Sequence, residues 1–194
     1  MTNSERPTNP QVQRTQKLML DAARGLLADH GPEGVTHLRV AGAAGVARAT
    51  VYRHWPDRAA ILLDLLRTSA DLDLAPPPPD SSITERVVIV LRTFAKALNG
   101  DGGRTLAAMI GLSEWDDDVF AALGRMATFG PMFLRSVLSD AVEQGLLDAR
   151  ADPALLADRL IGPLYFRRLL YHEDIENVYV DRLVEATIGP HLVD

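Results

Sequence analysis

The sequence contains no cysteine, which excludes disulfide bonds and thiolate metal sites and fits a reducing compartment. Residues 1–16 are polar and hold no apolar run resembling a signal peptide. No later stretch approaches the roughly 20 uninterrupted apolar residues that a membrane span needs. We therefore expect a cytoplasmic protein that has no membrane partner.

Motifs typical of enzymes are also missing, because the sequence has no nucleophile elbow, phosphate-binding glycine loop or zinc motif. Glu114 with Asp116–Asp118 lacks the alternating spacing of a calcium loop and favours a helix start instead. The run His172–Asp174 favours a solvated turn, since adjacent residues do not make a catalytic triad. We expect no catalytic residue, no metal and no cofactor.

Basic residues are fewer than acidic ones, and the two kinds are unevenly distributed along the chain. The 194 residues carry a net charge of -6, which argues at first sight against a nucleic-acid partner. Residues 1–60, however, hold eight Lys/Arg and five Asp/Glu, a balance of +3, while the remainder holds twelve and twenty-one, a balance of -9. A cationic end on an acidic body orients a protein toward a polyanion.

Helical periodicity runs through most of the chain, and no segment shows convincing strand alternation. We predict an all-α protein of about nine helices. The first begins after Asn9 and ends at Gly31, a short second one follows the cap Thr36, and Gly45 makes a tight turn into a third from about 47 to 54. Asp57 caps a fourth helix.

The proline run 76–79 predicts a stiff connector, after which Ser82–Glu85 has the spacing of a capping box. That box opens a helix that ends at Asn99. Further helices are expected near 104–113, 117–128, 131–144, 153–171 and 176–188. We predict two domains, a helix-turn-helix domain over 1–57 and a helical domain over 58–194.

The third helix and the residues just after it carry the chemistry that suggests a partner. Guanidinium, hydroxyl and imidazole groups, which donate to phosphate oxygens and base edges, gather at Arg48, Thr50, Tyr52, Arg53, His54 and Arg58. Ala47 and Ala49 leave room for close approach to a DNA groove. From the residues alone, an ordinary solvated helix remains equally possible.

The segment from about 15 to 66 resembles the N-terminal domain of the TetR family of bacterial one-component repressors. The matching positions are Gly31, Thr36, Val40-Ala41, Gly45-Val46, Ala49-Thr50-Val51-Tyr52, His54-Trp55 and Arg58. The resemblance implies phosphate contacts for Tyr52, His54 and Arg58, a cap and backbone role for Thr36, and base contacts for Arg48, Ala49, Thr50 and Arg53. Ala47 departs from the usual Ser cap, and Leu38 from a polar residue.

Residues 80–194 resemble the family in layout, which implies a homodimer that binds a palindromic double-stranded DNA operator and releases it when a small molecule binds. Bulky apolar residues that suggest a lipophilic effector pocket are Met109, Trp115, Phe120, Met126, Phe129, Met132, Phe133 and Tyr165. Core packing is the alternative for each of them.

The two closing helices are expected to form the dimer interface. Their candidate residues are Leu156, Leu160, Leu164, Leu183, Val184 and Ile188, with Leu155 and Leu169 beside them. For each of these the alternative is the core of a single chain. The rival for the whole protein is a small-molecule binding protein whose helix-turn-helix is only structural, and the cationic end weighs against it.

Overall fold

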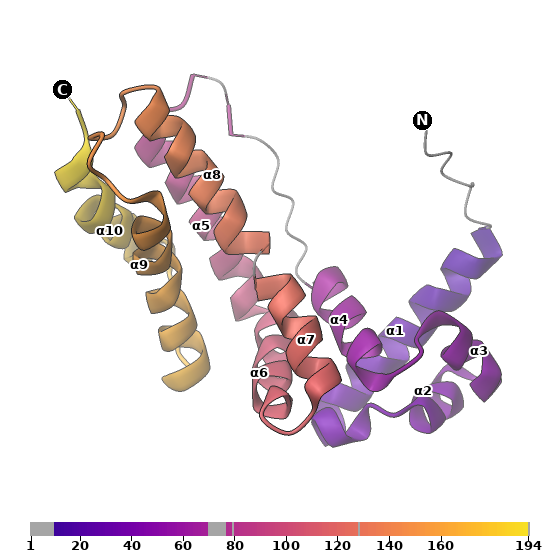
Figure 1. Cartoon of the computed structure of the whole chain (residues 1–194). Coiled ribbons are helices and arrows are strands. Elements are labelled where there is room, and N and C mark those ends of the chain that lie inside the picture. The colour runs from indigo at the N-terminus through magenta and orange to yellow at the C-terminus, as the bar shows by residue number, and fades with distance from the viewer. Residues whose placement is uncertain (1–9, 70–76, 79, 128, 194) are drawn as a thin grey trace. The chain divides into compact units, whose positions relative to one another are not determined.

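The computed structural model describes residues 10–69, 77–78, 80–127 and 129–193, without the side chains of residues 69 and 125–130. These described residues confirm the all-α class, with ten α-helices where about nine were predicted (Figure 1). The helices are α1 (Pro10–His30), α2 (His37–Ala44), α3 (Arg48–His54), α4 (Arg58–Ser69), α5 (Ile83–Asn99), α6 (Asp101–Ser113), α7 (Asp117–Ala127), α8 (Phe129–Glu143), α9 (Pro153–Tyr165) and α10 (Asn177–Ile188). The expected cap Asn9 and the connector residues Pro76 and Pro79 lie outside the described residues.

The chain divides into two compact units. The first unit contains the chain up to Leu65 together with Ala108–Ala122, and the second contains Leu66–Ala107 together with the chain from Leu123 onward. Helices α6 and α7 therefore each contain a point at which the chain passes from one unit to the other. The domain boundary expected after residue 57 stays a prediction. Within the described residues, no helix is both long and apolar enough to cross a membrane.

The first unit is built on the packing of α1 against α2 and of α2 against α3. Met19 of α1, Val40 of α2 and Val51 of α3 are fully buried between these helices. Gly31 adopts a φ of 65° just after α1, in the left-handed region that glycine enters without steric cost. The short helices thus gain their stability from a shared apolar core, since isolated helices of this length are marginal in water.

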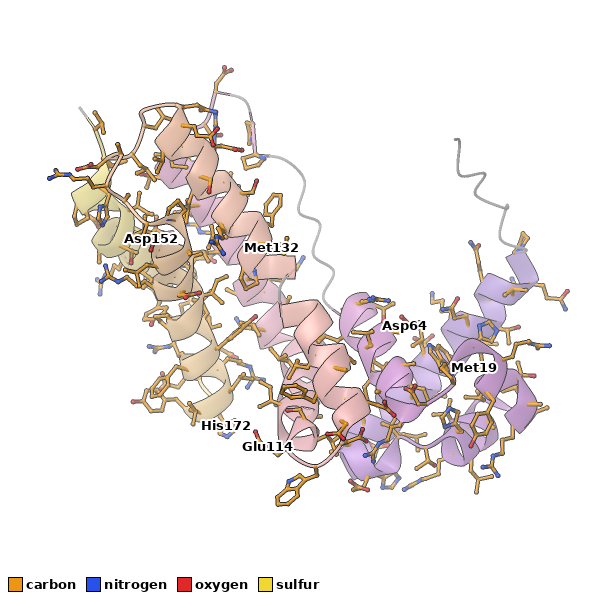
Figure 2. The ribbon with its side chains drawn as sticks, in the orientation of Figure 1. Met19, Asp64, Glu114, Met132, Asp152 and His172 are labelled. Carbon is orange, nitrogen blue, oxygen red and sulfur yellow. The ribbon has the colours of Figure 1, made fainter. Side chains whose placement is uncertain are left out.

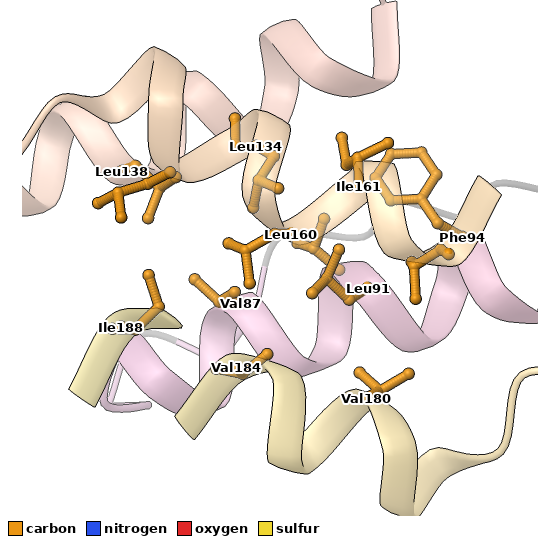
Figure 3. Packing of buried hydrophobic residues seen from close by; sticks show 14 of the residues in the cluster. Val87, Leu91, Phe94, Leu134, Leu138, Leu160, Ile161, Val180, Val184 and Ile188 are labelled. Atoms are coloured by element: carbon orange, nitrogen blue, oxygen red, sulfur yellow. The ribbon is translucent and has the colours of Figure 1, made fainter. Parts of the chain in front are cut away.

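The second unit is a bundle in which α5, α8, α9 and α10 enclose one apolar cluster. Figure 3 shows Val87 and Leu91 of α5 pointing toward Leu160 of α9, and Val184 of α10 belongs to the same cluster. The capping box predicted for α5 is confirmed, because Ser82 Oγ accepts from the Glu85 N–H at 3.2 Å while Glu85 accepts from the Ser82 N–H at 2.8 Å. The hydrogen bond from the Ser82 N–H lowers the pKa of the Glu85 carboxyl the most, and the hydrogen bond from the Ser82 hydroxyl lowers it further.

Helix α6 begins at Asp101, earlier than the predicted residue 104. Gly102 and Gly103 have low helix propensity, which made the sequence favour a later start. In the structure both glycines are buried, and a Cβ on Gly103 would lie 1.9 Å from the Leu98 carbonyl oxygen. The missing side chain lets the start of α6 lie against the end of α5.

The single helix predicted over 153–171 is divided. Helix α9 ends at Tyr165 and continues as a π-helical turn over Phe166–Leu170, in which the Tyr171 N–H donates to the Phe166 carbonyl at 3.3 Å. Pro163 lies inside α9 and has no N–H to donate. The altered hydrogen-bond pattern just after this proline is the physical reason for the difference.

The glycines give a matched stability prediction. We expect Gly103→Ala to destabilise the chain by about 1–3 kcal/mol, because the new methyl group has no room beside Leu98. Gly42→Ala should instead stabilise it by about 1 kcal/mol, because Gly42 is exposed inside α2 and a Cβ there meets nothing within 4 Å. Urea unfolding of both variants checks the opposite signs, and a shift of the same sign in both would contradict this packing.

Candidate nucleic-acid interface

Local signals at both ends of α2 make the helix-turn-helix. At the start, the Thr36 hydroxyl accepts a hydrogen bond from the Arg39 N–H at 3.3 Å, which confirms the predicted cap. At the end, Gly45 has φ 65° and ψ 31°, and the following Val46 N–H donates to the Ala41 carbonyl at 3.0 Å. This turn delivers the chain into α3.

Helix α3 has no side-chain cap, as its alanine predicted. Ala47 occupies the cap position with extended backbone and makes no side-chain hydrogen bond, although the Thr50 N–H donates to its carbonyl at 2.8 Å. Val51 is the fully buried anchor of the helix. Burial against α2 therefore holds this seven-residue helix in place.

The solvent face of α3 carries the polar groups predicted to contact DNA. Arg48, Ala49 and Arg53 are exposed, whereas Thr50 and His54 are half-buried. Tyr52 has 43% of its surface exposed. The helix thus presents two guanidinium groups and a phenol to solvent around a small alanine, which suits contact with phosphates and base edges.

Tyr52 is the centre of a side-chain stack. An Arg48 Nη2–H donates to the Tyr52 hydroxyl at 3.0 Å, and the guanidinium carbon lies 5.2 Å from the centroid of the tyrosine ring. The Tyr52 ring is also parallel to the His37 imidazole, at a centroid distance of 4.0 Å and an interplanar angle of 5°. These contacts restrict the rotamers of Arg48 and Tyr52 before any ligand arrives.

The residue that follows α3 ties the helix to its neighbours. The Trp55 indole is 2% exposed, and its Nε1–H donates to Asp64 Oδ2 of α4 at 2.8 Å. Asp64 also accepts from Gln16 Nε2 of α1 at 3.4 Å. Figure 2 shows Asp64 on α4 and the buried Met19 on α1. These hydrogen bonds fix the end of α3.

A shallow groove of about 420 Å³ runs between the start of α1 and α3. Gln11, Val12 and Thr15 of α1 line one side of it. The other side is lined by Val46, Ala47, Thr50, Arg53 and His54. The groove brings hydroxyl, amide, imidazole and guanidinium groups together beside the predicted DNA-reading face.

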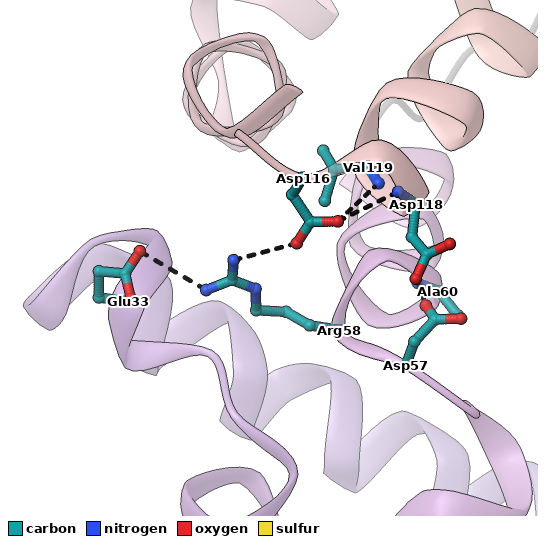
Figure 4. Close-up of polar contacts among 7 residues, drawn as sticks. All are labelled: Glu33, Asp57, Arg58, Ala60, Asp116, Asp118 and Val119. Carbon is teal, nitrogen blue, oxygen red and sulfur yellow. Dashed lines mark hydrogen bonds and ion pairs between the residues drawn. The ribbon is translucent and has the colours of Figure 1, made fainter. Parts of the chain in front are cut away.

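Arg58, predicted to contact phosphate, lies in an ion-pair cluster (Figure 4). Its Nη2 is 3.3 Å from Asp116 Oδ2, and its Nη1 is 3.5 Å from Glu33 Oε1. The side chain is 25% exposed. Two carboxylates therefore share this guanidinium, and a phosphate would have to compete with them.

Asp116 also caps α7, as the sequence predicted for this acidic segment. Its Oδ1 accepts from the Val119 N–H at 3.1 Å and from the Asp118 N–H at 3.2 Å. The Val119 hydrogen bond is the main cause of the lowered pKa of the Asp116 carboxyl, and Arg58 lowers it further. The carboxylate is therefore charged at neutral pH. Asp57 caps α4 in the same way by accepting from the Ala60 N–H at 2.7 Å.

The predicted effector residues do not gather in one place among the described side chains. Met109 is fully buried, whereas Trp115 and Phe120 are 90% and 66% exposed, and all three belong to the first unit. Met132 on α8 is exposed (Figure 2). The side chains of Met126 and Phe129 lie outside the described residues.

Phe133 of α8 and Tyr165 of α9 have a different environment. Both are half-buried and pack against the apolar cluster of the second unit. Burial raises the pKa of the Tyr165 phenol, so its hydroxyl stays protonated at neutral pH. These two residues offer an apolar surface with one polar group inside a single unit.

Five of the six candidate interface residues are buried within the single chain, where they form part of the cluster of the second unit. These are Leu156, Leu160, Leu164, Val184 and Ile188, while Leu183 is half-buried. The structure thus favours the core alternative for the five buried side chains, since they leave no surface for a partner to cover. The large apolar residues that α9, its π-turn and α10 do expose are Leu155, Phe166, Leu170 and Val178.

Sequence reasoning missed three residues of this region: His37, Asp64 and Asp116 as a partner of Arg58. His37 occupies the inward-facing register of Val40 and Ala41, so a polar residue at an apolar position was the available signal. The pairing of Asp116 with Arg58 joins residues far apart in the chain, and no local pattern announces it.

Comparison with known families assigns the chain to a class. The family described as "Bacterial regulatory proteins, tetR family" matches residues 19–65, and the family described as "Tetracyclin repressor-like, C-terminal domain" matches residues 77–187. The chain belongs to the TetR family of helix-turn-helix transcriptional regulators, and it is a DNA-binding regulator rather than an enzyme. The resemblance predicted for the segment from about 15 to 66 is thereby confirmed.

Individual relatives agree with this assignment. The uncharacterized HTH-type transcriptional regulator YdeS of Bacillus subtilis is 29% identical over 177 residues, which cover 90% of this chain and 88% of YdeS. The crystal structure of the TetR family regulator SCO0332 shares 27% identity, covers 89% of this chain and 95% of its own, and has a TM-score of 0.67.

A third structure, the regulator FadR of Bacillus subtilis in complex with stearoyl-CoA, shares the fold. It is 16% identical, covers 90% of this chain and 98% of its own, and has a TM-score of 0.71.

Proposed function

We propose that the chain is a repressor that binds a palindromic operator as a homodimer and is released by a small, apolar effector. The observation that carries DNA recognition is the ordered polar face of α3, in which Tyr52 is stacked on His37 and bonded to Arg48. Side chains held in place before binding lose less conformational entropy when DNA arrives. A helix-turn-helix kept only for structure would have no need of this arrangement.

The proposed contacts are those that the family resemblance implies for the groups on this face. Arg48, Ala49, Thr50 and Arg53 face the bases, with Tyr52 and His54 on flanking phosphates and Thr36 beside the backbone. The groove next to Gln11 and Thr15 extends the polar surface toward the start of α1. A titration of the whole chain with labelled duplexes from its own upstream region tests this proposal. Saturable binding to one duplex supports it, and equal affinity for all duplexes contradicts operator recognition.

The dimer is proposed to form on the outer face of α9 and α10. Along α9 and into its π-turn, exposed residues opposite the buried stripe recur at three- and four-residue spacing, namely Leu155, Arg159, Gly162 and Phe166. Phe166 makes an edge contact with Tyr171 at a centroid distance of 4.8 Å, and Leu170 is 65% exposed beside them. A two-fold axis would bring the apolar residues Leu155, Phe166 and Leu170 against their own copies, with the exposed Arg159 between them in sequence.

The effector is proposed to bind in the second unit against Phe133 and Tyr165. Their apolar bodies suit a lipophilic molecule, and the protonated Tyr165 hydroxyl offers one hydrogen bond. The stearoyl-CoA complex of FadR supports this class, since a protein of the same fold holds a molecule with a long acyl chain.

Thermal unfolding with a panel of acyl and aromatic compounds tests the effector class. We expect at least one lipophilic compound to raise the melting temperature and to release operator DNA, because a ligand that binds only the folded state stabilises it. The same compound should have no effect on a Phe133→Glu variant. A response confined to polar compounds would contradict the proposal.

The ion pair between Arg58 and Asp116 is proposed to couple effector binding to the release of operator DNA. Asp116 opens α7, the helix through which the chain passes into the second unit at Leu123. Any effector that shifts α7 therefore changes the hold of Asp116 on Arg58 at the start of α4. Such differential contacts are what allows a ligand to shift an equilibrium.

Replacing Asp116 by Asn should tighten operator binding several-fold. Asn still caps a helix, but it no longer competes with phosphate for Arg58. Glu33, whose side chain is 80% exposed, stays as the other partner of Arg58, so the salt dependence of binding should steepen by at most about one unit for each Arg58 that gains a phosphate contact. Asp118→Asn is the matched control, because Asp118 lies in the same turn and uses only its backbone N–H in the cluster. Equal effects of the two variants in an anisotropy titration would rule out this coupling.

A further inference from the structure

His37 is a buried polar residue in the helix-turn-helix. It is 9% exposed and lies on α2 in the same inward-facing register as Val40 and Ala41. A polar ring at such a position is unfavourable unless its nitrogen atoms find hydrogen-bond partners. The contacts of His37 therefore show what the imidazole does there.

Both contacts of the imidazole lead to α3 and the residue after it. His37 Nε2 is 2.9 Å from the Trp55 carbonyl oxygen, and because a carbonyl only accepts, Nε2 carries the hydrogen. The face of the ring is stacked on Tyr52, with centroids 4.0 Å apart and planes 5° from parallel. The His37 side chain of α2 thus contacts the last turn of α3 in two ways: its Nε2–H donates to the Trp55 carbonyl, and its ring face stacks on Tyr52.

The far side of the same turn is held by α4. Asp64 accepts from the Trp55 indole at 2.8 Å, so Trp55 is fixed through its carbonyl by His37 and through its ring by Asp64. Tyr52, between these anchors, accepts the hydrogen bond of Arg48 at 3.0 Å. The chain of contacts therefore runs from a buried histidine to two side chains on the exposed face.

We propose that His37 is a positioning residue for operator binding, which acts by stacking on Tyr52 and so presetting the Tyr52 and Arg48 side chains. With 9% of its surface exposed, His37 itself has little surface that could contact DNA. The inference rests on the proposed operator binding of α3. His37 is not among the residues that the sequence predicted to contact DNA.

Two conservative variants separate the two contacts. His37→Gln keeps an N–H donor for the Trp55 carbonyl and loses the stack, whereas His37→Phe keeps the stack and loses the donor. We expect His37→Gln to weaken operator binding at least about tenfold, because each of the two subunits loses one side-chain interaction that contributes roughly twofold to tenfold. His37→Phe should bind more tightly than His37→Gln. The control is His172→Asn, an exposed histidine with φ 56° in the second unit, which Asn tolerates.

A double-mutant cycle with Tyr52→Ala distinguishes a positioning role of His37 from a merely structural one. If His37 acts through Tyr52, His37→Gln should cause less than about a twofold further loss once Tyr52 is already Ala. If His37 serves only folding, the two losses in affinity should multiply, and that result would overturn the proposal.

The outcomes also separate this inference from the proposed function. Wild-type protein that binds its operator while His37→Gln binds equally well contradicts the role of His37 and leaves operator binding intact. Wild-type protein that binds no duplex overturns both. Thermal unfolding of each variant accompanies the titrations, and the His37→Phe variant supplies the comparison if His37→Gln does not fold.

Discussion

Glu at both Leu155 and Phe166 should convert the dimer into monomers and weaken operator binding at least a hundredfold. The two positions lie on the exposed stripe of α9 and its π-turn, with 48% of each side chain exposed in the single chain. A two-fold interface would bury four new carboxylates without partners, and each burial is costly. A monomer also loses the gain in affinity that comes from tethering two DNA-reading units.

Sedimentation velocity at micromolar concentration checks the dimer, and the same samples are titrated with operator. Ile89→Glu is the matched control, because Ile89 is an exposed apolar residue of α5 in the same unit with 39% of its surface exposed. The control should remain a dimer. A double variant that still sediments as a dimer would show that this stripe lies outside the interface.

The second large effect is expected on the recognition helix. Tyr52→Ala should weaken binding to operator and to unrelated DNA together, because a phosphate contact carries no sequence information. Arg53→Ala should instead reduce the preference for the operator, by about 1–3 kcal/mol for each half-site at which the guanidinium reads a base. Both side chains are exposed on α3, so neither change creates a cavity in the core.

Competition titrations with operator and scrambled duplexes measure the two effects separately. Arg135→Ala on α8 is the control for loss of an exposed arginine in the second unit. Selectivity that stays unchanged in Arg53→Ala, together with operator affinity that stays unchanged in Tyr52→Ala, would remove α3 from the interface.

The helix-turn-helix was predictable because its signals are local. The Thr36 hydroxyl caps α2 three residues away, Gly45 has the positive φ that a tight turn needs, and Gly31 ends α1. Each of these features depends on residues within one or two turns. The helix-turn-helix and the polar face of α3 could therefore be inferred from the amino-acid sequence alone.

Contacts between distant residues decided what the sequence did not predict. Leu156 and Val184 have the apolar spacing of an interface and also of a core, and only the packing of α5 against α9 and α10 places them inside. Gly103 has no room for a side chain because the Leu98 carbonyl approaches it. His37 and Arg58 contact Trp55 and Asp116, partners far from them in the chain that no local pattern indicates.

Selection of bound sequences from a library of random DNA duplexes tests the central claim most directly. We predict that the full chain enriches a motif of two inverted half-sites whose centres lie roughly 34–36 Å apart, one turn of DNA, because two copies of α3 must enter successive major grooves. Tyr52→Ala should recover the same motif with weaker enrichment. No enrichment, or enrichment of a single half-site without symmetry, would contradict recognition of an operator by a dimer.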